Sequence, residues 1–168
     1  LSAPLAASEF QEKEILRASN AFLPFKTEKH AERLSISQLI NRALHEIIGQ
    51  NENVVHLGED IGDPYGGAFK VTQGLSEQFP NRVINTPISE AGFTAIANGL
   101  ALRGYPVIVE IMFGDFLFIA ADQIVNHAVK FLEMYGRKCD MPVVIRTPMG
   151  ARRSYGPTHS QSLEKHFF

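Results

Sequence analysis

Thr86-Pro87-Ile88-Ser89-Glu90-Ala91-Gly92 is the stretch of this sequence that decides its fold. The apolar-alternating run at residues 82–85 predicts a short strand before it, and Pro87 favours a tight loop at the end of that strand. Ser89 suits a helix N-cap, with Glu90 in the first turn, where the helix dipole favours a carboxylate. The pattern places a carboxylate at the carboxyl end of a strand, where open α/β sheets bind ligands. The local pattern also allows another interpretation, in which Glu90 does not bind a ligand and only interacts with the helix dipole.

Strand and helix patterns alternate on both sides of this stretch. Helical spacing predicts a helix from the N-cap Ser35 to Gly49, a short helix at 72–79, a helix after Glu90 and a long helix from about 119 to 135. Apolar runs at 54–58, 105–112 and 141–147 are typical of parallel strands that are covered on both faces. We therefore expect an α/β, three-layer domain with a mainly parallel central sheet and helices on both faces.

Composition excludes several classes of function. The 168 residues suit one domain with a substantial core, and a net charge of −2 gives no reason to expect binding to nucleic acid or a membrane surface. The longest apolar run, at 107–121, is interrupted by Glu110, Gly114 and Asp115, so it is not predicted to span a membrane. The single cysteine, Cys139, excludes an internal disulfide framework and a multi-cysteine metal site.

The two ends of the sequence suggest a piece of a longer protein. Residues 1–34 are expected to be a partly disordered leader or linker, and residues 35–168 the domain itself. The first segment carries acidic and basic residues about equally and has no apolar core, which argues against a transit peptide and a secretory signal. The absence of an initial Met suggests a cleaved product or a segment cut from a longer protein. Because the sequence stops at the large apolar residues Phe167-Phe168, we expect truncation at the C-terminal end of the domain.

Four loops are predicted to meet at one edge of the sheet, because each follows the carboxyl end of a strand. Glu59 and Glu90 would supply carboxylates there, and His159 a group that titrates near neutral pH. Such a site suits acid–base chemistry on a flat, partly apolar ligand. No metal site and no phosphate-binding glycine motif is evident in the sequence. Aromatic side chains would form an apolar wall: Phe113, Phe116 and Phe118.

Five motifs in fixed order make the sequence resemble one family. They are Gly58-Glu59-Asp60, residues 67–75, residues 86–90, residues 122–126 and His159-Ser160-Gln161. In this order and spacing they resemble the beta-type chain of the thiamine-diphosphate-dependent 2-oxo acid dehydrogenases, the decarboxylating component of the pyruvate and branched-chain complexes. The resemblance covers about residues 35–168, which correspond to the transketolase-like pyrimidine-binding domain of that chain.

The resemblance implies a role for Glu90. It falls on the glutamate that hydrogen-bonds the ring nitrogen of the cofactor's aminopyrimidine. Protonation of that ring turns the exocyclic amino group into the imino form that removes the proton from the thiazolium carbon. A carboxylate suits this work because burial raises its pKa and lets it share a proton with a weakly basic nitrogen.

The resemblance implies roles for six further residues. Phe116 falls on the aromatic that stacks on the pyrimidine, and the alternative is that it only packs in the core. His159 falls on the histidine near the thiazolium that assists acyl transfer, and the alternative is a hydrogen-bonded loop histidine. Glu59 and Asp122 fall on acidic residues that relay protons between paired cofactor sites. The alternatives are a bond from Glu59 to loop backbone and a helix cap for Asp122. Further cofactor contacts are expected from Glu59, Ile88 and Met112.

One half of the cofactor site is missing from the sequence. The diphosphate and its Mg²⁺ require a GDG-type loop followed by an Asn, and Gly62-Asp63-Pro64 with Asn85 only mimics that spacing. The resemblance therefore implies an alpha-type chain, or a fused alpha portion, that brings the diphosphate and the metal. It also implies a homodimer of the beta-type domain and a lipoyl-bearing acyltransferase as partners. Ile119 and residues 112–115 depart from the family pattern.

Two other functions stay open from the sequence. One is a relative of transketolase or deoxyxylulose-phosphate synthase. The run Thr158–Gln161 disfavours it, because this motif is associated with the dehydrogenase branch. The other is a non-catalytic assembly domain, which retention of both Glu90 and His159 disfavours. The substrate, whether pyruvate, a branched-chain 2-oxo acid or acetoin, and the role of Arg152 and Arg153 are not specified. The expected location is the bacterial cytoplasm, or the mitochondrial matrix in a eukaryote.

Overall fold

A parallel sheet is the centre of the computed structural model, which describes residues 34–136, 140–150 and 154–167. All strand pairs are parallel, in the order β2-β1-β3-β4, which confirms the expected α/β class. Residues 1–33 of the leader predicted at 1–34 lie outside the described residues, as do Cys139 and the pair Arg152-Arg153. The strands are β1 (Val55–Glu59), β2 (Val83–Thr86), β3 (Val107–Glu110) and β4 (Val143–Arg146).

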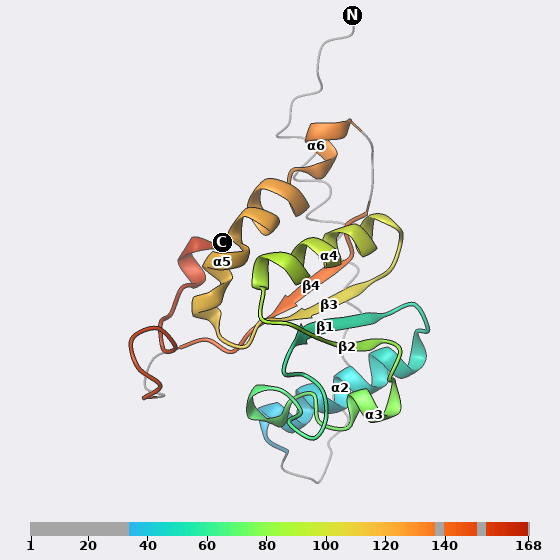
Figure 1. Cartoon of the computed structure of the whole chain (residues 1–168), viewed down its shortest axis with the longest axis vertical. Helices are drawn as coiled ribbons and strands as arrows, with labels where there is room; N and C mark the ends of the chain where they lie inside the picture. The colour runs from blue at the N-terminus through green and yellow to red at the C-terminus, as the bar shows by residue number, and fades with distance from the viewer. Residues whose placement is uncertain (1–33, 137–139, 151–153, 168) are drawn as a thin grey trace, which may run out of the picture. The chain divides into compact units, whose positions relative to one another are not determined.

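Helices cover both faces of the sheet, because alternate strand residues point to opposite sides. Ile108 of β3 packs in one core cluster with residues of α2 (Ile36–Gln50) and α3 (Leu75–Gln78). Its neighbours Val107 and Val109 pack in a second cluster with α4 (Glu90–Leu102) and α5 (Leu117–Asp122). Figure 1 shows these two helical layers on either side of the strands. The three-layer arrangement is that expected from the sequence.

Ser35 is the N-cap of α2, as the sequence predicts, and the structure adds a capping box with Gln38. The Ser35 hydroxyl accepts a hydrogen bond from the backbone N–H of Gln38 at 3.3 Å, and the Gln38 side chain accepts one from the backbone N–H of Ser35 at 2.8 Å. The helix runs to Gln50, one residue beyond the predicted end at Gly49. The capping bonds fix where the chain enters the domain.

Replacement of Ser35 by alanine is expected to lower the free energy of unfolding by about 1 kcal/mol, because it leaves an N–H of the first turn unpaired. Ser89→Ala is the matched control. Ser89 occupies the N-cap position of α4, but its side chain makes no capping bond. Urea denaturation of both variants tests the prediction, and equal losses would contradict it.

Two helix predictions are wrong in extent. The helix expected at 72–79 is reduced to α3, because Gly74 adopts the left-handed conformation with φ of 81° and ends the preceding turn. The long helix expected from 119 to 135 is divided into α5, the π-helix η3 (Gln123–Ala128) and α6 (Phe131–Tyr135). The short 3₁₀ turns are η1 (Ala68–Lys70), η2 (Gly114–Phe116) and η4 (Glu164–His166).

His56 is fully buried in β1. Neither of its ring nitrogens has a hydrogen-bond partner among the described residues. Its Nε2 lies 3.9 Å from an oxygen of Glu110, which is itself paired with Arg146 on the neighbouring strand β4. The sheet therefore contains a buried polar group that the sequence analysis did not anticipate.

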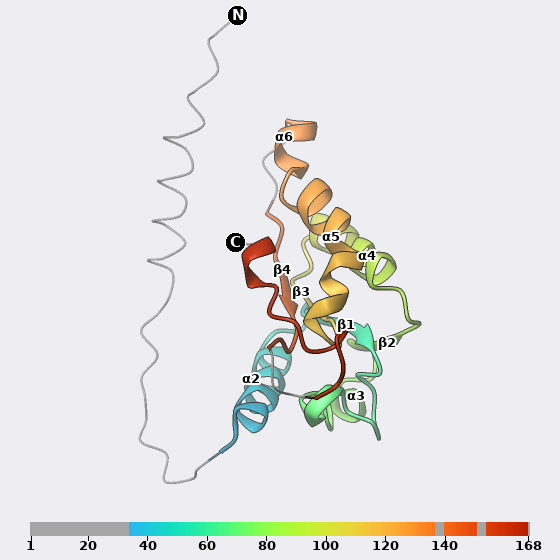
Figure 2. The ribbon, with the colours of Figure 1, turned by 90° about the vertical axis from the view of Figure 1, so that its left-hand side faces the viewer.

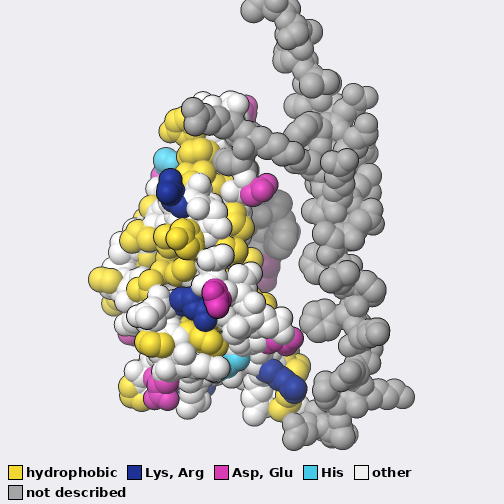
Figure 3. Space-filling model, turned by 90° about the vertical axis from the view of Figure 1, so that its right-hand side faces the viewer, with side chains coloured by type: hydrophobic (Ala, Val, Ile, Leu, Met, Phe, Trp, Pro, Cys, Tyr) yellow, Lys and Arg dark blue, Asp and Glu magenta, His cyan; other side chains and the backbone are white. Residues whose placement is uncertain are grey.

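The surface view gives a direct picture of charge distribution. Figure 3 shows the side of the molecule where the strands begin, and acidic and basic side chains are interspersed there among apolar ones. Within the described residues, no helix is both long and apolar enough to cross a bilayer.

Candidate active site

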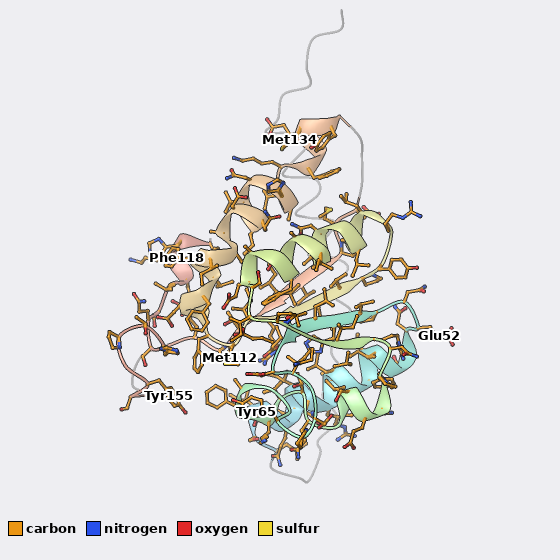
Figure 4. All side chains as sticks on the ribbon, viewed as in Figure 1. Glu52, Tyr65, Met112, Phe118, Met134 and Tyr155 are labelled. Atoms are coloured by element: carbon orange, nitrogen blue, oxygen red, sulfur yellow. The ribbon has the colours of Figure 1, made fainter. Side chains whose placement is uncertain are left out.

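The carboxyl ends of the strands carry the candidate site, as the sequence predicts. The parallel register aligns Glu59 at the end of β1 with Thr86 at the end of β2, immediately before the loop to Glu90. The segment that follows β4 runs across the same side of the sheet (Figures 1 and 2). In Figure 4 the labelled Met112 and Tyr155 lie on this side, whereas Glu52 lies at the opposite edge.

Glu59 and Glu90 form a pair of buried carboxylates, each only 5% exposed. Burial raises the pKa of the Glu59 carboxyl, and the nearby negative charges of Glu90 and Asp60 raise it further. One oxygen of Glu59 has no hydrogen-bond partner among the described residues. In the alternative, Glu59 only binds loop backbone, but this oxygen accepts no such bond. Two carboxylates in one buried place can share protons with a ligand.

The position of Glu90 follows from its local sequence. β2 ends at Thr86, and α4 begins at Glu90 after the loop that contains Pro87. A Cβ at Gly92 would lie 2.6 Å from the hydroxyl oxygen of Ser89, so a larger residue there would require the Ser89 side chain to move. Gly92 thus leaves room for the Ser89 side chain beside Glu90, and the predicted capping bond from Ser89 is not formed.

Glu59→Gln is expected to stabilise the chain at neutral pH. Since the folded-state pKa of Glu59 is raised, the folded chain binds its proton more tightly than the unfolded chain. The free energy of unfolding therefore falls as pH rises from the ordinary carboxyl pKa of 4.5 through the raised pKa of the folded chain. Glutamine does not ionise, so it removes that loss. We expect the melting temperature to rise by about 2 °C or more at pH 7. At pH 4 native and variant chains should melt alike, and a pH-independent difference would contradict the assignment.

Aromatic rings surround His159 beside the loop after β3. Its ring contacts Phe113 at 5.0 Å and Phe116 at 5.2 Å between centroids, both edge to face. Phe113 also contacts Phe116 at 6.1 Å and Tyr155 at 5.8 Å. The Nδ1 of His159 lies 2.9 Å from the Thr158 hydroxyl. The imidazole is thus held on an apolar wall, as predicted for Phe113 and Phe116. Phe118 instead contacts His166 and Phe167.

The histidine loop is fixed to the loop after β3. The Gln161 side chain donates to the Asp115 carboxylate at 2.7 Å, and the backbone N–H of Gly150 donates to the Gln161 carbonyl at 3.2 Å. A Cβ at Gly114 would lie 2.6 Å from the side chain of Met149, so glycine permits this close approach. The sequence analysis missed Tyr155 and Asp115 because their role depends on contacts between distant segments.

The other candidate residues lie outside these two groups. Ile88 is 79% exposed, Met112 is partly buried, and the Asp122 side chain is 62% exposed on the helix surface. Asp122 ends α5 and accepts hydrogen bonds from Gln123 and Asn126, so the predicted cap of a continuous helix is not its role. Within the described residues, no hydrogen bond or ring contact joins the carboxylate pair to the aromatic group.

The stretch that mimics a diphosphate motif is committed to its own loop. The Asp63 carboxylate accepts hydrogen bonds from the backbone of Gly74 and the Ser76 hydroxyl. Burial alone would raise the Asp63 pKa, but these and neighbouring hydrogen bonds lower it overall. Asn85 accepts from the backbone of Gly62 at 3.3 Å. Across the described part of the chain, no three His, Cys, Asp or Glu side chains gather as a metal site.

Comparison with known proteins agrees with this arrangement. The family model "Transketolase, pyrimidine binding domain" matches residues 32–167. The chain is 38% identical over 141 residues to the pyruvate dehydrogenase E1 component subunit beta of Leifsonia xyli, covering 83% of this chain and 42% of that protein. The sequence resemblance to beta-type chains is confirmed by this match.

Two further relatives carry other substrate names. The acetoin:2,6-dichlorophenolindophenol oxidoreductase subunit beta of Bacillus subtilis is 38% identical over 142 residues, covering 77% of this chain and 42% of that protein. The 3-methyl-2-oxobutanoate dehydrogenase subunit beta of Mycobacterium tuberculosis is 38% identical over 135 residues, covering 80% and 38%. The chain spans about two-fifths of the length of these relatives. By fold, site position and family match, the chain belongs to the transketolase pyrimidine-binding domain family.

Proposed function

We propose that this chain supplies the pyrimidine-binding half of a thiamine diphosphate site in the decarboxylating component of a 2-oxo acid dehydrogenase. The observation that carries the proposal is the buried carboxylate pair of Glu59 and Glu90, in which one Glu59 oxygen has no partner among the described residues and the pKa of Glu59 is raised. The names of the beta-subunit relatives support the class of reaction. The whole activity belongs to a larger assembly than this chain.

The carboxylate pair fits the aminopyrimidine ring of the cofactor. A buried carboxylate without a protein donor is costly unless a ligand supplies one, and a protonated ring nitrogen is such a donor. Glu90 would hold that proton, and Glu59 would return protons to it. When bound, thiamine diphosphate supplies a nucleophilic carbon that attacks the 2-oxo group and accepts the electrons released by decarboxylation.

The aromatic group would position the ligand and the histidine. Phe116 would stack on the pyrimidine, a contact worth about 0.5–1.5 kcal/mol beyond buried area. Ile88, exposed in this chain, and Met112 would complete the apolar contacts around the ring. His159, held by Phe113 and Phe116, would donate a hydrogen bond near the reacting carbon and assist acyl transfer.

The proposal includes partners that supply the missing parts. An alpha-type chain, or a fused alpha portion, would bind the diphosphate through Mg²⁺, and Asp122 would relay protons between the paired sites of a beta-domain homodimer. A lipoyl-bearing acyltransferase would accept the acyl group. The location would be the bacterial cytoplasm or, for a eukaryotic protein, the mitochondrial matrix, since a mitochondrial relative from Oryza sativa is also similar.

Reconstitution tests the proposed function. We expect no release of CO₂ from pyruvate or a branched-chain 2-oxo acid by this chain alone with thiamine diphosphate and Mg²⁺. Addition of an alpha-type partner should produce release, because each side holds half of the site. Activity of the isolated chain would contradict the division of the site. Transfer from ketose phosphates without action on 2-oxo acids would instead indicate a transketolase-like enzyme.

A further inference from the structure

The π-helix η3 brings together two side chains that an α-helix would hold apart. Asp122 and His127 are five residues apart, and their carboxylate oxygen and ring Nε2 lie 3.4 Å from each other. In an α-helix five residues cover about 1.4 turns, so such side chains point in different directions. A π turn closes on the fifth residue, and the bond from the Val129 N–H to the Ile124 carbonyl at 3.1 Å shows that closure here.

Asn98 of α4 is the side chain that meets this turn. Its amide nitrogen donates a hydrogen bond of 2.9 Å to the backbone carbonyl of Gln123, the first residue of η3. Entry of a side chain into the hydrogen-bond ladder is a recognised cause of helix distortion. Without this amide, the Gln123 carbonyl would be available to the i+4 bond of an ordinary α-helix. The amide therefore favours the π turn over a continuous α-helix.

Asn98 is also costly, which argues for a role beyond packing. The residue is buried, and its side-chain oxygen has no hydrogen-bond partner among the described residues. A buried unpaired carbonyl oxygen destabilises a fold relative to an apolar side chain of the same shape. The helix α4 thus retains an unfavourable group at the point where it sets the geometry of Asp122 and His127.

We propose that Asn98 holds the π turn so that Asp122 and His127 form a carboxylate–imidazole dyad, and that His127 exchanges protons between Asp122 and solution. The imidazole takes a proton from water at one ring nitrogen and gives the proton on Nε2 to the Asp122 carboxylate, or the reverse. This role rests on the proposed function, in which Asp122 relays protons. The His127 side chain is 48% exposed in the single chain, which leaves one side of the imidazole open to solution.

The surroundings of the dyad contain few other charges. Asp122 is the one charged residue of α5, and α4 has no charged residue after Glu90. Lys130 donates to the Asn126 side chain at 3.3 Å, and Asn126 donates to Asp122 at 2.9 Å. Glu133 on α6 is the remaining charged group of the helical segments that contact η3. Asp122 is therefore the partner that His127 faces most closely.

Nitrogen NMR of the full chain, with no cofactor added, tests the dyad. Asp122→Asn should shift the Nε2 resonance of His127 when Asn98 is present, but not when it is introduced into an Asn98→Leu chain. Asn98→Leu should also change the hydrogen-exchange rate of the Val129 amide. Thr94→Val is the matched control, since Thr94 is a buried polar residue one turn earlier in α4. The control should leave both signals unchanged. An Asp122 effect that persists in Asn98→Leu, or that is absent from the native chain, overturns the proposal.

Chemical rescue in the assembled enzyme tests the proton exchange. His127→Ala should lower kcat about tenfold or more with KM unchanged, and imidazole in solution should restore part of the loss. A purely structural role would not respond to imidazole, so unchanged kcat or failure of rescue contradicts proton exchange. An assembly that never decarboxylates with the native chain contradicts the proposed function instead, whereas the NMR result decides the dyad independently.

Discussion

Glu90→Gln is expected to reduce decarboxylation by the assembled enzyme at least about 10²-fold, the lower range for loss of general acid–base catalysis. Glutamine keeps the size of the side chain but cannot hold the proton that the pyrimidine ring requires. Because the two side chains have the same size, the substitution should preserve the fold around the buried position at the start of α4. The measurement is the steady-state rate of CO₂ release with each 2-oxo acid.

The control for this variant separates chemistry from binding. Phe118→Leu removes an aromatic ring from the same sheet edge, but that ring contacts His166 and Phe167, away from His159. It should leave kcat within about twofold, since it touches no proposed site residue. Cofactor affinity should fall far less than kcat in Glu90→Gln. Equal activity of Glu90→Gln and the native chain would refute the proton-holding role.

Arg146→Met is expected to destabilise the chain by about 3–5 kcal/mol. Glu110 is 2% exposed, and its carboxylate accepts two hydrogen bonds from the Arg146 guanidinium, one of them at 2.5 Å. Without the arginine, a buried carboxylate loses its partner, and His56 at 3.9 Å makes no hydrogen bond to replace it. Urea denaturation at pH 7 measures the loss.

The double variant Glu110→Met with Arg146→Met is the control. It removes both charges together, so it should recover most of the lost stability. The site accepts an apolar side chain, because Arg146 lines an apolar cavity of about 410 Å³ between α2 and the strands β3 and β4. A double variant as unstable as Arg146→Met would show that the charge pair is not the reason for the loss.

Much of the fold was predictable because its signals are local. Ser35 with Gln38 marks the start of α2, and Thr86-Pro87 marks the end of β2. The shared edge for Glu59, Glu90 and His159 follows from parallel strands, whose carboxyl ends meet. Their individual roles rest on the family resemblance and stay proposals, since burial and contacts alone do not identify the ligand.

The remaining features depend on contacts between distant residues. The break in the helix predicted from 119 to 135 arises where Asn98, on another helix, bonds the carbonyl of Gln123. No local pattern in residues 119–135 specifies that bond. The Glu110–Arg146 pair had a weak signal, since each is the lone charged residue in an apolar strand. This pattern could have predicted that the two side chains pair across the sheet.

Proton exchange at the reactive carbon of thiamine diphosphate tests the central claim most directly. The assembly of this chain with an alpha-type partner, cofactor and Mg²⁺ is mixed with D₂O, and deuterium uptake at that carbon is followed without any 2-oxo acid. The account predicts fast uptake with the native chain and uptake at least about 10²-fold slower with Glu90→Gln. Equal rates in the two assemblies would show that Glu90 does not start the chemistry.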